Sequence, residues 1–273
     1  MNILCVHRAH RFSPNSVERD AKVLQEIADQ FRQSNHQVIC CEEAEVVEVV
    51  GNHSWDVIIS MARSQAALQV LLHAEQNGVR VLNSASSLLE VDRVALTEKF
   101  QRAKVQMPMT QVVKHPRKAS IPFPYWVKSG AAGAVAEADV VYIPSVEALE
   151  QCCFEDGQYV VAQHVIGDLI KFYGVAGTSF FYFYYPTATT DGFSKFGLEC
   201  INGKPHYVQF KVEALQCIAN KAAEASGYTI YGGDCVVAAD GTIYLIDFND
   251  FPSFSSCREA VAEAMLNLIL GNG

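Results

Sequence analysis

The sequence between residues 233 and 250 reads Gly233-Asp234-Cys235-Val236-Val237-Ala238-Ala239-Asp240-Gly241-Thr242-Ile243-Tyr244-Leu245-Ile246-Asp247-Phe248-Asn249-Asp250. Asp240-Gly241 between two apolar runs is a strong signal for a tight turn, so we predict a β-hairpin. Pairing of its strands brings Asp234 and Asp247 to the same end of the ladder, and the strand period of two puts Asn249 on the face of Asp247. Carboxylate and amide oxygens suit Mg²⁺, which predicts a metal site of Asp234, Asp247 and Asn249. The alternative is an ordinary turn whose acidic strand ends are solvated.

A second informative stretch leads a strand directly into a loop of small residues. Lys128 ends the apolar run that begins at Tyr125, and Ser129, Gly130 and Gly133 follow it. Small residues let the backbone approach phosphate oxygens closely, with amide N–H groups as donors and the lysine as a point charge. The stretch predicts a phosphate-binding loop, although it matches neither a Walker A loop nor the G-x-G-x-x-G pattern. The alternative is a flexible hairpin loop of glycine and alanine.

A third stretch places polar residues beside two apolar strands. The apolar run of residues 159–162 ends in Gln163, His164 and Val165, and Lys171 lies alone within the next apolar run. A lysine inside an apolar strand costs free energy unless it snorkels to solvent or meets an anion. Lys171 is therefore a candidate for binding an anion, and the alternative is an edge-strand lysine that faces solvent.

The order of apolar segments divides the chain into three parts. Alternating strand and helix patterns between residues 1 and 85 predict a small doubly wound parallel sheet, an α/β domain. A helical pattern from about Ser86 to Lys104 follows, and strand signals then dominate in an α+β arrangement, so we place the domains at 1–85, 86–165 and 166–273. The predicted strands span residues 3–6, 37–41, 56–60, 79–82, 125–128, 140–143, 159–165, 170–175, 179–185 and 207–212, and the predicted helices 17–31, 66–74, 86–104, 213–226 and 256–270.

The composition excludes several classes of protein. Half of the 273 residues are hydrophobic and 19% are charged, so the chain can bury a sizeable core. The formal net charge of -9 gives no overall basic field for nucleic acid. No run of 18 apolar residues occurs, and the N-terminus is too polar for a signal peptide, so we expect no membrane association. Nine cysteines, an odd number without a C-x-x-C pattern, predict a reduced, cytoplasmic protein.

The loop after the first predicted strand carries a polar cluster. It reads His7-Arg8-Ala9-His10-Arg11-Phe12-Ser13-Pro14-Asn15-Ser16, and Arg63 follows the third strand at the same end of the sheet. Ligands of open parallel sheets bind outside the carboxyl ends of the strands, and a helix that begins near Asn15 also favours anions. We therefore predict a small anionic substrate bound by His7, Arg8, Arg11, Ser13, Asn15 and Arg63. The alternative is that the loop arginines are simply solvated.

Taken together and in this order, the segments resemble the ATP-grasp superfamily, especially ribosomal-protein glutamate ligases, glutathione synthetases and inositol polyphosphate kinases. The resemblance covers roughly residues 79–270 and includes Asp92-Arg93 and Met107-Pro108-Met109-Thr110. It implies the ATP-grasp fold, with ATP and Mg²⁺ as cofactors and Asp234, Asp247 and Asn249 as metal ligands. It also implies nucleotide binding by Arg93, Lys128, Ser129, Gly130, Gly133, Gln163, His164, Val165 and Lys171. Arg93 stands where the family usually has a lysine, which keeps the charge but changes the geometry.

The resemblance implies an enzyme, and the fold hosts both ligases and kinases. We expect an ATP-grasp ligase that activates a small carboxylic acid as an acyl phosphate and joins it to an amine or similar nucleophile. Such ligases usually carry an arginine ahead of the helix that precedes the metal strands, where this chain offers only Lys211, so Lys211 and Lys171 are the candidate catalytic residues. The alternatives are a kinase of a polyol or phosphorylated small molecule and a non-catalytic nucleotide-binding module. The acceptor and the oligomeric state stay open, with a homodimer as one option.

Overall fold

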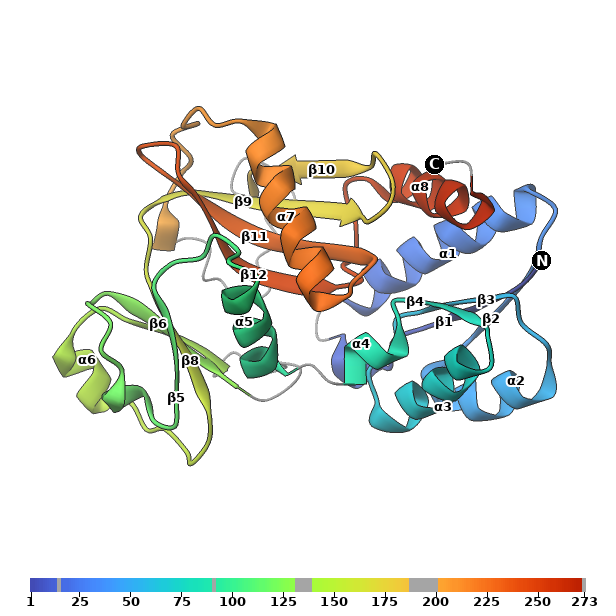
Figure 1. Cartoon of the computed structure of the whole chain (residues 1–273), viewed down its shortest axis with the longest axis horizontal. Coiled ribbons are helices and arrows are strands. Elements are labelled where there is room, and N and C mark those ends of the chain that lie inside the picture. The colour runs from blue at the N-terminus through green and yellow to red at the C-terminus, as the bar shows by residue number, and fades with distance from the viewer. Residues whose placement is uncertain (14–15, 90–91, 131–138, 187–200, 272–273) are drawn as a thin grey trace.

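The structure is a computed structural model that describes residues 1–13, 16–89, 92–130, 139–186 and 201–271. Three four-stranded sheets organise these residues, one of them parallel and two antiparallel (Figure 1). This combination confirms the predicted α/β and α+β fold class. None of the described helices is long and apolar enough to cross a membrane.

The N-terminal sheet is parallel, with the strand order β2-β1-β3-β4. Alternation along β1 puts Ile3 and Cys5 in the core beneath α1, and Leu4 and Val6 in the core beneath α2 and α3. Helices on both faces explain why its central strands read as continuous apolar runs. The elements of this part are β1 (Asn2–Val6), η1 (His10–Phe12), α1 (Val17–Gln33), β2 (Gln37–Cys41), η2 (Glu43–Glu45), α2 (Val46–Asn52), β3 (Val57–Ser60), α3 (Gln65–Gln76) and β4 (Arg80–Leu82).

The helix expected over residues 86–104 is two helices, α4 (Ala85–Leu89) and α5 (Arg93–Arg102). Asp92 begins the second one, because its carboxylate accepts a 2.7 Å hydrogen bond from the Ala95 amide. An aspartate at this position satisfies a backbone donor of the first helical turn, which favours a new helix start over a continuous helix. The apolar residues on both sides of Asp92 have helical spacing, so periodicity alone predicts one continuous helix here.

The central sheet is antiparallel, with the order β5-β8-β6-β7. One face of β6 packs Tyr125 and Val127 into a small core with α6, and its other face carries Trp126 and Lys128. The elements are β5 (Thr110–Val113), η3 (Pro116–Lys118), β6 (Tyr125–Ser129), β7 (Val140–Ile143), α6 (Val146–Gln151) and β8 (Tyr159–Gln163). The short elements α2, α6 and β5 are additions to the predicted set.

The C-terminal sheet is antiparallel, with the order β10-β9-β11-β12. Helix α7 packs in one core with β9, β11 and β12, and α8 packs with α1 in the core that continues from the N-terminal sheet (Figure 1). The predicted hairpin is present, and Gly241 adopts the left-handed backbone (φ 82°) that its turn requires. The elements are β9 (Gly167–Val175), β10 (Phe181–Tyr184), α7 (Val212–Ser226), β11 (Ile230–Ala238), β12 (Ile243–Asp250) and α8 (Arg258–Leu270).

The strand expected over residues 207–212 is wrong, because this stretch is a loop that leads into α7. The buried carboxylate of Asp168 accepts hydrogen bonds from the backbone amides of His206 and Val208, at 2.7 and 2.8 Å. Tyr207 between them has a left-handed backbone, with φ 57°. A side chain from β9 thus takes the place of a neighbouring strand as the partner of these amides.

One residue ties the N-terminal sheet to the C-terminal sheet. The buried side chain of Asn83 accepts hydrogen bonds from the amides of Thr229 and Ile230, at 2.8 and 2.6 Å, and donates one of 2.7 Å to the Ile230 carbonyl. The side chains of Phe251 and Phe254 belong to the core beneath α1, which extends the same junction. These contacts join the segment after β4 to the start of β11, and the segment after β12 to the core beneath α1. The domain limits 1–85, 86–165 and 166–273 stay predictions.

Candidate nucleotide and metal site

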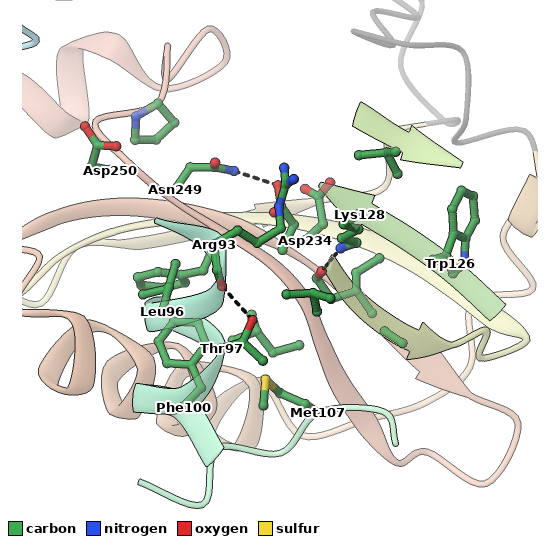
Figure 2. A pocket seen from close by; sticks show the side chains of 18 of the residues that line it. Arg93, Leu96, Thr97, Phe100, Met107, Trp126, Lys128, Asp234, Asn249 and Asp250 are labelled. Atoms are coloured by element: carbon green, nitrogen blue, oxygen red, sulfur yellow. Dashed lines mark hydrogen bonds between the residues drawn. The ribbon is translucent and has the colours of Figure 1, made fainter. Parts of the chain in front are cut away.

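A cavity of about 460 Å³ is lined by strands of the two antiparallel sheets, by α5, and by loops and α1 of the N-terminal part. This volume is in the range of small-molecule sites. Lys128 enters it from the central sheet, Asp234 and Asn249 from the C-terminal sheet, and Arg93 from the start of α5 (Figure 2). Its lining includes apolar residues of the central and C-terminal sheets, which we call the apolar slot: Val140, Val160, Ala162, Leu169, Val236 and Leu245. A slot of this kind suits a planar aromatic base.

The carboxylates at the polar end of the cavity lie as the hairpin predicts. Asp234 and Asp247 are direct partners in the β11–β12 register. The side-chain amide of Asn249 donates a 2.7 Å hydrogen bond to the Asp247 carboxylate, as Figure 2 shows. This bond confirms that the two side chains share one face, and it leaves the amide oxygen of Asn249 as an acceptor.

Three cations surround these carboxylates. Lys171 contacts Asp234 at 3.0 and 3.2 Å, and Lys128 donates a 2.6 Å hydrogen bond to the Ile246 carbonyl. Arg93 donates to the carbonyl of Ser129, which holds its guanidinium at the cavity. Burial by itself raises the pKa of the Asp247 carboxyl, but the charges of Lys128 and Arg93 hold it below its ordinary value. Asp247 is therefore ionised at neutral pH.

The donor set fits magnesium better than a transition metal. Within the described ranges, no group of three or more His, Cys, Asp and Glu side chains could hold a metal ion, so a protein-only cage is absent there. Mg²⁺ is usually held by one or two carboxylates together with substrate phosphates and water. Asp234, Asp247 and the amide oxygen of Asn249 supply that chemistry beside cations that can hold phosphates.

The segment expected to bind the nucleotide, residues 163–165, lies along the same cavity, and Gln163, His164 and Val165 all line it. The Nδ1 atom of His164 accepts a 3.1 Å hydrogen bond from the indole N–H of Trp126. Because an indole can only donate, the neutral imidazole carries its proton on Nε2. Burial lowers the pKa of His164, which favours this neutral form. His164 is thus held in the tautomer that can donate a hydrogen bond from Nε2.

The glycine-rich loop is described only at its start. Gly130 donates a 2.8 Å hydrogen bond from its amide to the Gln158 carbonyl, and a Cβ atom at Gly130 would lie 2.5 Å from that oxygen. Close approach of two backbone segments therefore requires glycine here. Neither Ser129 nor Gly130 lines the cavity. Gly133 lies outside the described residues.

The predicted acceptor residues are only partly brought together. Arg8, Ser13 and Arg63 line the cavity, whereas Arg11 is exposed and lies over the ring of Phe12, 4.7 Å from its centroid. His7 lies outside the lining as well, and Asn15 is not among the described residues. The expected convergence of three arginines is therefore limited to two.

The two arginines at the cavity are already held by protein groups. Arg8 donates to Asp20 at 3.1 Å, to the Met61 carbonyl at 3.2 Å and to the Phe251 carbonyl at 2.9 Å. Arg63 forms an ion pair with the buried Asp250.

Of the two arginines, Arg8 therefore positions the loop, while Arg63 stays available to a substrate. The side chain of Arg63 is 29% exposed, whereas that of Arg8 is 10% exposed. Their acidic partners, Asp20 and Asp250, were missed in the sequence, because neither belongs to a recognisable motif. The sequence offers one signal for Asp250, which directly follows the predicted metal ligand Asn249.

Lys211 does not lie at the cavity. It is the exposed residue directly before α7, and it is absent from the lining. A Cβ atom at Gly241 would lie 3.1 Å from the Gln209 carbonyl, which places this stretch at the turn of the hairpin. Asp247 lies toward the opposite end of the same strands. Lys171 is not among the lining residues either, but it contacts Asp234, which is. Of the two predicted catalytic lysines, only Lys171 therefore lies beside the cavity.

No protein-family model and no curated protein sequence matches the chain. Solved structures match over nearly its whole length. A RimK domain protein ATP-grasp from Sphaerobacter thermophilus is 17% identical, with a TM-score of 0.69 over 99% of this chain and 100% of that one. N5-carboxyaminoimidazole ribonucleotide synthetase from Thermotoga maritima is 14% identical, with a TM-score of 0.64 over 97% of this chain and 76% of that one. D-alanine–D-alanine ligase from Bacillus anthracis, complexed with ATP, is 12% identical, with a TM-score of 0.62 over 100% of both chains.

Proposed function

We propose that this chain, which has the ATP-grasp fold, is an ATP- and Mg²⁺-dependent ligase that joins a small carboxylic acid to an amine or similar nucleophile through an acyl phosphate. The observation that carries the proposal is the convergence of Lys128 and Arg93 with Asp234, Asp247 and Asn249 at one end of a single cavity. Two of the similar structures are by name a synthetase and a ligase, and the ligase is complexed with ATP, which supports the reaction class.

Each end of the cavity has its own task. The apolar slot takes the base, with His164 as a hydrogen-bond donor in the same cavity. Lys128 and Arg93 hold the phosphates and keep them in line with the acceptor. Mg²⁺, when bound by the carboxylates and by Asn249, neutralises charge on the phosphate oxygens. Lys171 stays beside Asp234 and balances the charge of the metal ligands.

A ligase also needs a group that stabilises the oxyanion when the nucleophile attacks the acyl phosphate. Lys211 lies away from the cavity, so this role falls to Arg63. Asp250 directly follows the metal ligand Asn249 in β12, and its ion pair with Arg63 fixes that guanidinium at the acceptor side of the cavity. The same position suits the carboxylate of a small anionic acceptor.

A kinase is the second candidate, and one observation favours it. The stretch in which ligases of this type usually carry an arginine, residues 205–211, contributes no residue to the lining of the cavity. A kinase transfers the phosphoryl group to the acceptor and needs no stabiliser for a later tetrahedral intermediate. Arg63 is the group whose role separates the two candidates, because a ligase needs it after phosphoryl transfer as well.

The proposal is tested with a panel of carboxylic acids and amines, scored for ADP and for free phosphate in the presence of Mg-ATP. A ligase releases both products in equal amounts, and only when acid and nucleophile are present together. Release of ADP with the phosphate kept stably on the acceptor would assign the chain to the kinases. Tight Mg-ATP binding without turnover over the whole panel would support a non-catalytic nucleotide-binding module.

A further inference from the structure

Two cysteine side chains lie next to each other beneath α1, and neither lines the cavity. Cys5 of β1 and Cys40 of β2 are direct partners in the parallel register. Both contribute to the core that faces α1, so their side chains point to the same face of the sheet. Neighbouring strands are about 4.8 Å apart, and a disulfide needs about 4.4–6.8 Å between the two Cα atoms. The Cα spacing of neighbouring strands is therefore within the range of a disulfide.

The two thiols differ in their electrostatic surroundings. The guanidinium of Arg32, in the last turn of α1, lies 3.5 Å from the Cys40 sulfur and also contacts Asp29 at 2.8 Å. A hydrogen bond from the Cys5 thiol lowers the pKa of Cys40 to about 6, and the charges of Arg32 and His7 act in the same direction against the effect of burial. The same hydrogen bond and burial raise the pKa of Cys5. The contact with Arg32 and the hydrogen bond from Cys5 thus favour the thiolate at Cys40 over that at Cys5.

The next residue provides a matched comparison. Cys41 follows Cys40 on the same strand but points to the opposite face of the sheet, into the core with α2 and α3. Burial, followed by the charge of Glu45, raises its pKa to about 12. Cys40 lies on the edge strand β2 and is partly exposed, so a small oxidant can reach its sulfur. Low pKa, exposure and a neighbouring second thiol are the properties of an oxidation-sensitive cysteine.

We propose that Cys40 and Cys5 form an oxidation site that hydrogen peroxide converts into an intramolecular disulfide. The Cys40 thiolate attacks one peroxide oxygen, the O–O bond breaks, and one water leaves after protonation of the other oxygen. The Cys40 sulfenic acid that results is attacked by the Cys5 sulfur, and the sulfenic oxygen leaves as a second water. The two sulfurs together lose two electrons, and one peroxide becomes two waters. Cys40 is the attacking residue and Cys5 the resolving one.

Peptide mass spectrometry of the full chain tests the pairing directly. Trypsin leaves Cys5 in residues 1–8, and it leaves Cys40 and Cys41 together in residues 33–63, so the experiment uses the Cys41→Ser variant. After peroxide treatment without reductant, we expect the two peptides joined with a loss of two hydrogens. In Cys5→Ser, dimedone should instead trap a sulfenic acid at Cys40. Joined peptides in wild type but not in Cys41→Ser, or a disulfide between two copies of the chain, would overturn the proposal.

Alkylation by iodoacetamide tests the role of the charges around Cys40. The titrating and charged groups that face its sulfur are Cys5 from β1, His7 directly after β1 and Arg32 from α1. For a thiol of pKa about 6, the thiolate fraction falls only about 2-fold between pH 8 and pH 6, whereas for an ordinary thiol of pKa about 8.5 it falls about 75-fold.

We expect the shallow dependence for Cys40 in the Cys41→Ser variant and a steeper one when Arg32→Gln is added. The exposed Cys217 serves as the internal control. A dependence for Cys40 as steep as that for Cys217 would contradict the assignment of Cys40 as the attacking thiolate.

Discussion

Lys128 donates a 2.6 Å hydrogen bond to the backbone carbonyl of Ile246, from the central sheet to the C-terminal sheet. The register of β11 and β12 shifts at this point, because Asp234 pairs with Asp247 while Cys235 pairs with Leu245, which leaves Ile246 as the bulged residue. A bulge takes its residue out of the regular ladder, so the Ile246 carbonyl can accept from a side chain. The lysine is therefore held beside Asp247 before any phosphate arrives.

Lys128→Met should weaken Mg-ATP binding strongly. Loss of a charged donor to phosphate costs about 1.5–3 kcal/mol, which corresponds to an increase of about 10- to 150-fold in Kd. Isothermal titration calorimetry with Mg-ATP measures the effect. The control is Lys118→Met, since Lys118 is an exposed lysine that is not among the cavity-lining residues. Equal Kd values for the two variants would remove Lys128 from the nucleotide site.

Asp247→Asn and Asn249→Ala should lose turnover while the fold is kept. Loss of one positioned electrostatic contact costs about 2.7–4 kcal/mol of transition-state stabilisation, or about 10²–10³ in rate. The matched control is Asp240→Asn, at the turn of the same hairpin and outside the cavity, which should keep the wild-type rate. Rates are compared at saturating Mg²⁺, with circular dichroism to confirm folding. Near-wild-type rates for both site variants would show that these residues are not metal ligands.

Arg63→Ala and Arg11→Ala should separate the acceptor site from the surface of the same domain. Arg63 lines the cavity in its ion pair with Asp250, whereas Arg11 lies exposed on Phe12. We expect Arg63→Ala to lower kcat/KM for the acceptor by about 10²-fold, as for the loss of one charged contact of about 3 kcal/mol. Arg11→Ala should change it less than about 2-fold, because an exposed cation is largely solvated. ATP affinity should be unchanged in both, and a loss of ATP binding in Arg63→Ala would place this residue elsewhere.

Asn83→Ala should destabilise the junction between the N-terminal and C-terminal sheets. The substitution leaves the buried amides of Thr229 and Ile230 without their acceptor. Each unsatisfied buried group costs about 1–3 kcal/mol, so we expect the free energy of unfolding to fall by about 2–4 kcal/mol in urea denaturation. Asn77→Ala is the control, because Asn77 caps α3 at the surface through an exposed contact with His73. A loss below about 1 kcal/mol for Asn83→Ala would mean that water replaces the amide.

The hairpin and the convergence of Asp234, Asp247 and Asn249 at one end of it could be predicted because their geometry is local. An Asp-Gly turn fixes the register, and the register fixes which side chains share a face. The acceptor side depends on long-range contacts instead. Whether Arg63 meets Asp250 or solvent is decided by how β12 ends against the parallel sheet, and no spacing within either segment contains that information.

The wrong strand over residues 207–212 also explains where Lys211 lies. The apolar pattern of residues 207–212 is typical of a strand, but the buried carboxylate of Asp168 takes the amides that a strand would pair. Lys211 follows directly in this stretch, so its distance from the cavity depends on the same distant contact. Lys211 is close in sequence to β11 and β12, but this closeness does not predict its position in the structure.

Hydroxamate formation tests the central claim most directly, because hydroxylamine is a general nucleophile toward acyl phosphates and removes the need to know the natural amine. The chain is incubated with Mg-ATP, hydroxylamine and each of a panel of carboxylic acids, with Asp247→Asn as the inactive control. We predict that at least one acid gives a hydroxamate together with equal amounts of ADP and free phosphate, and only with the wild-type chain. Release of ADP with a stable phosphorylated acceptor and no hydroxamate would contradict the assignment as a ligase.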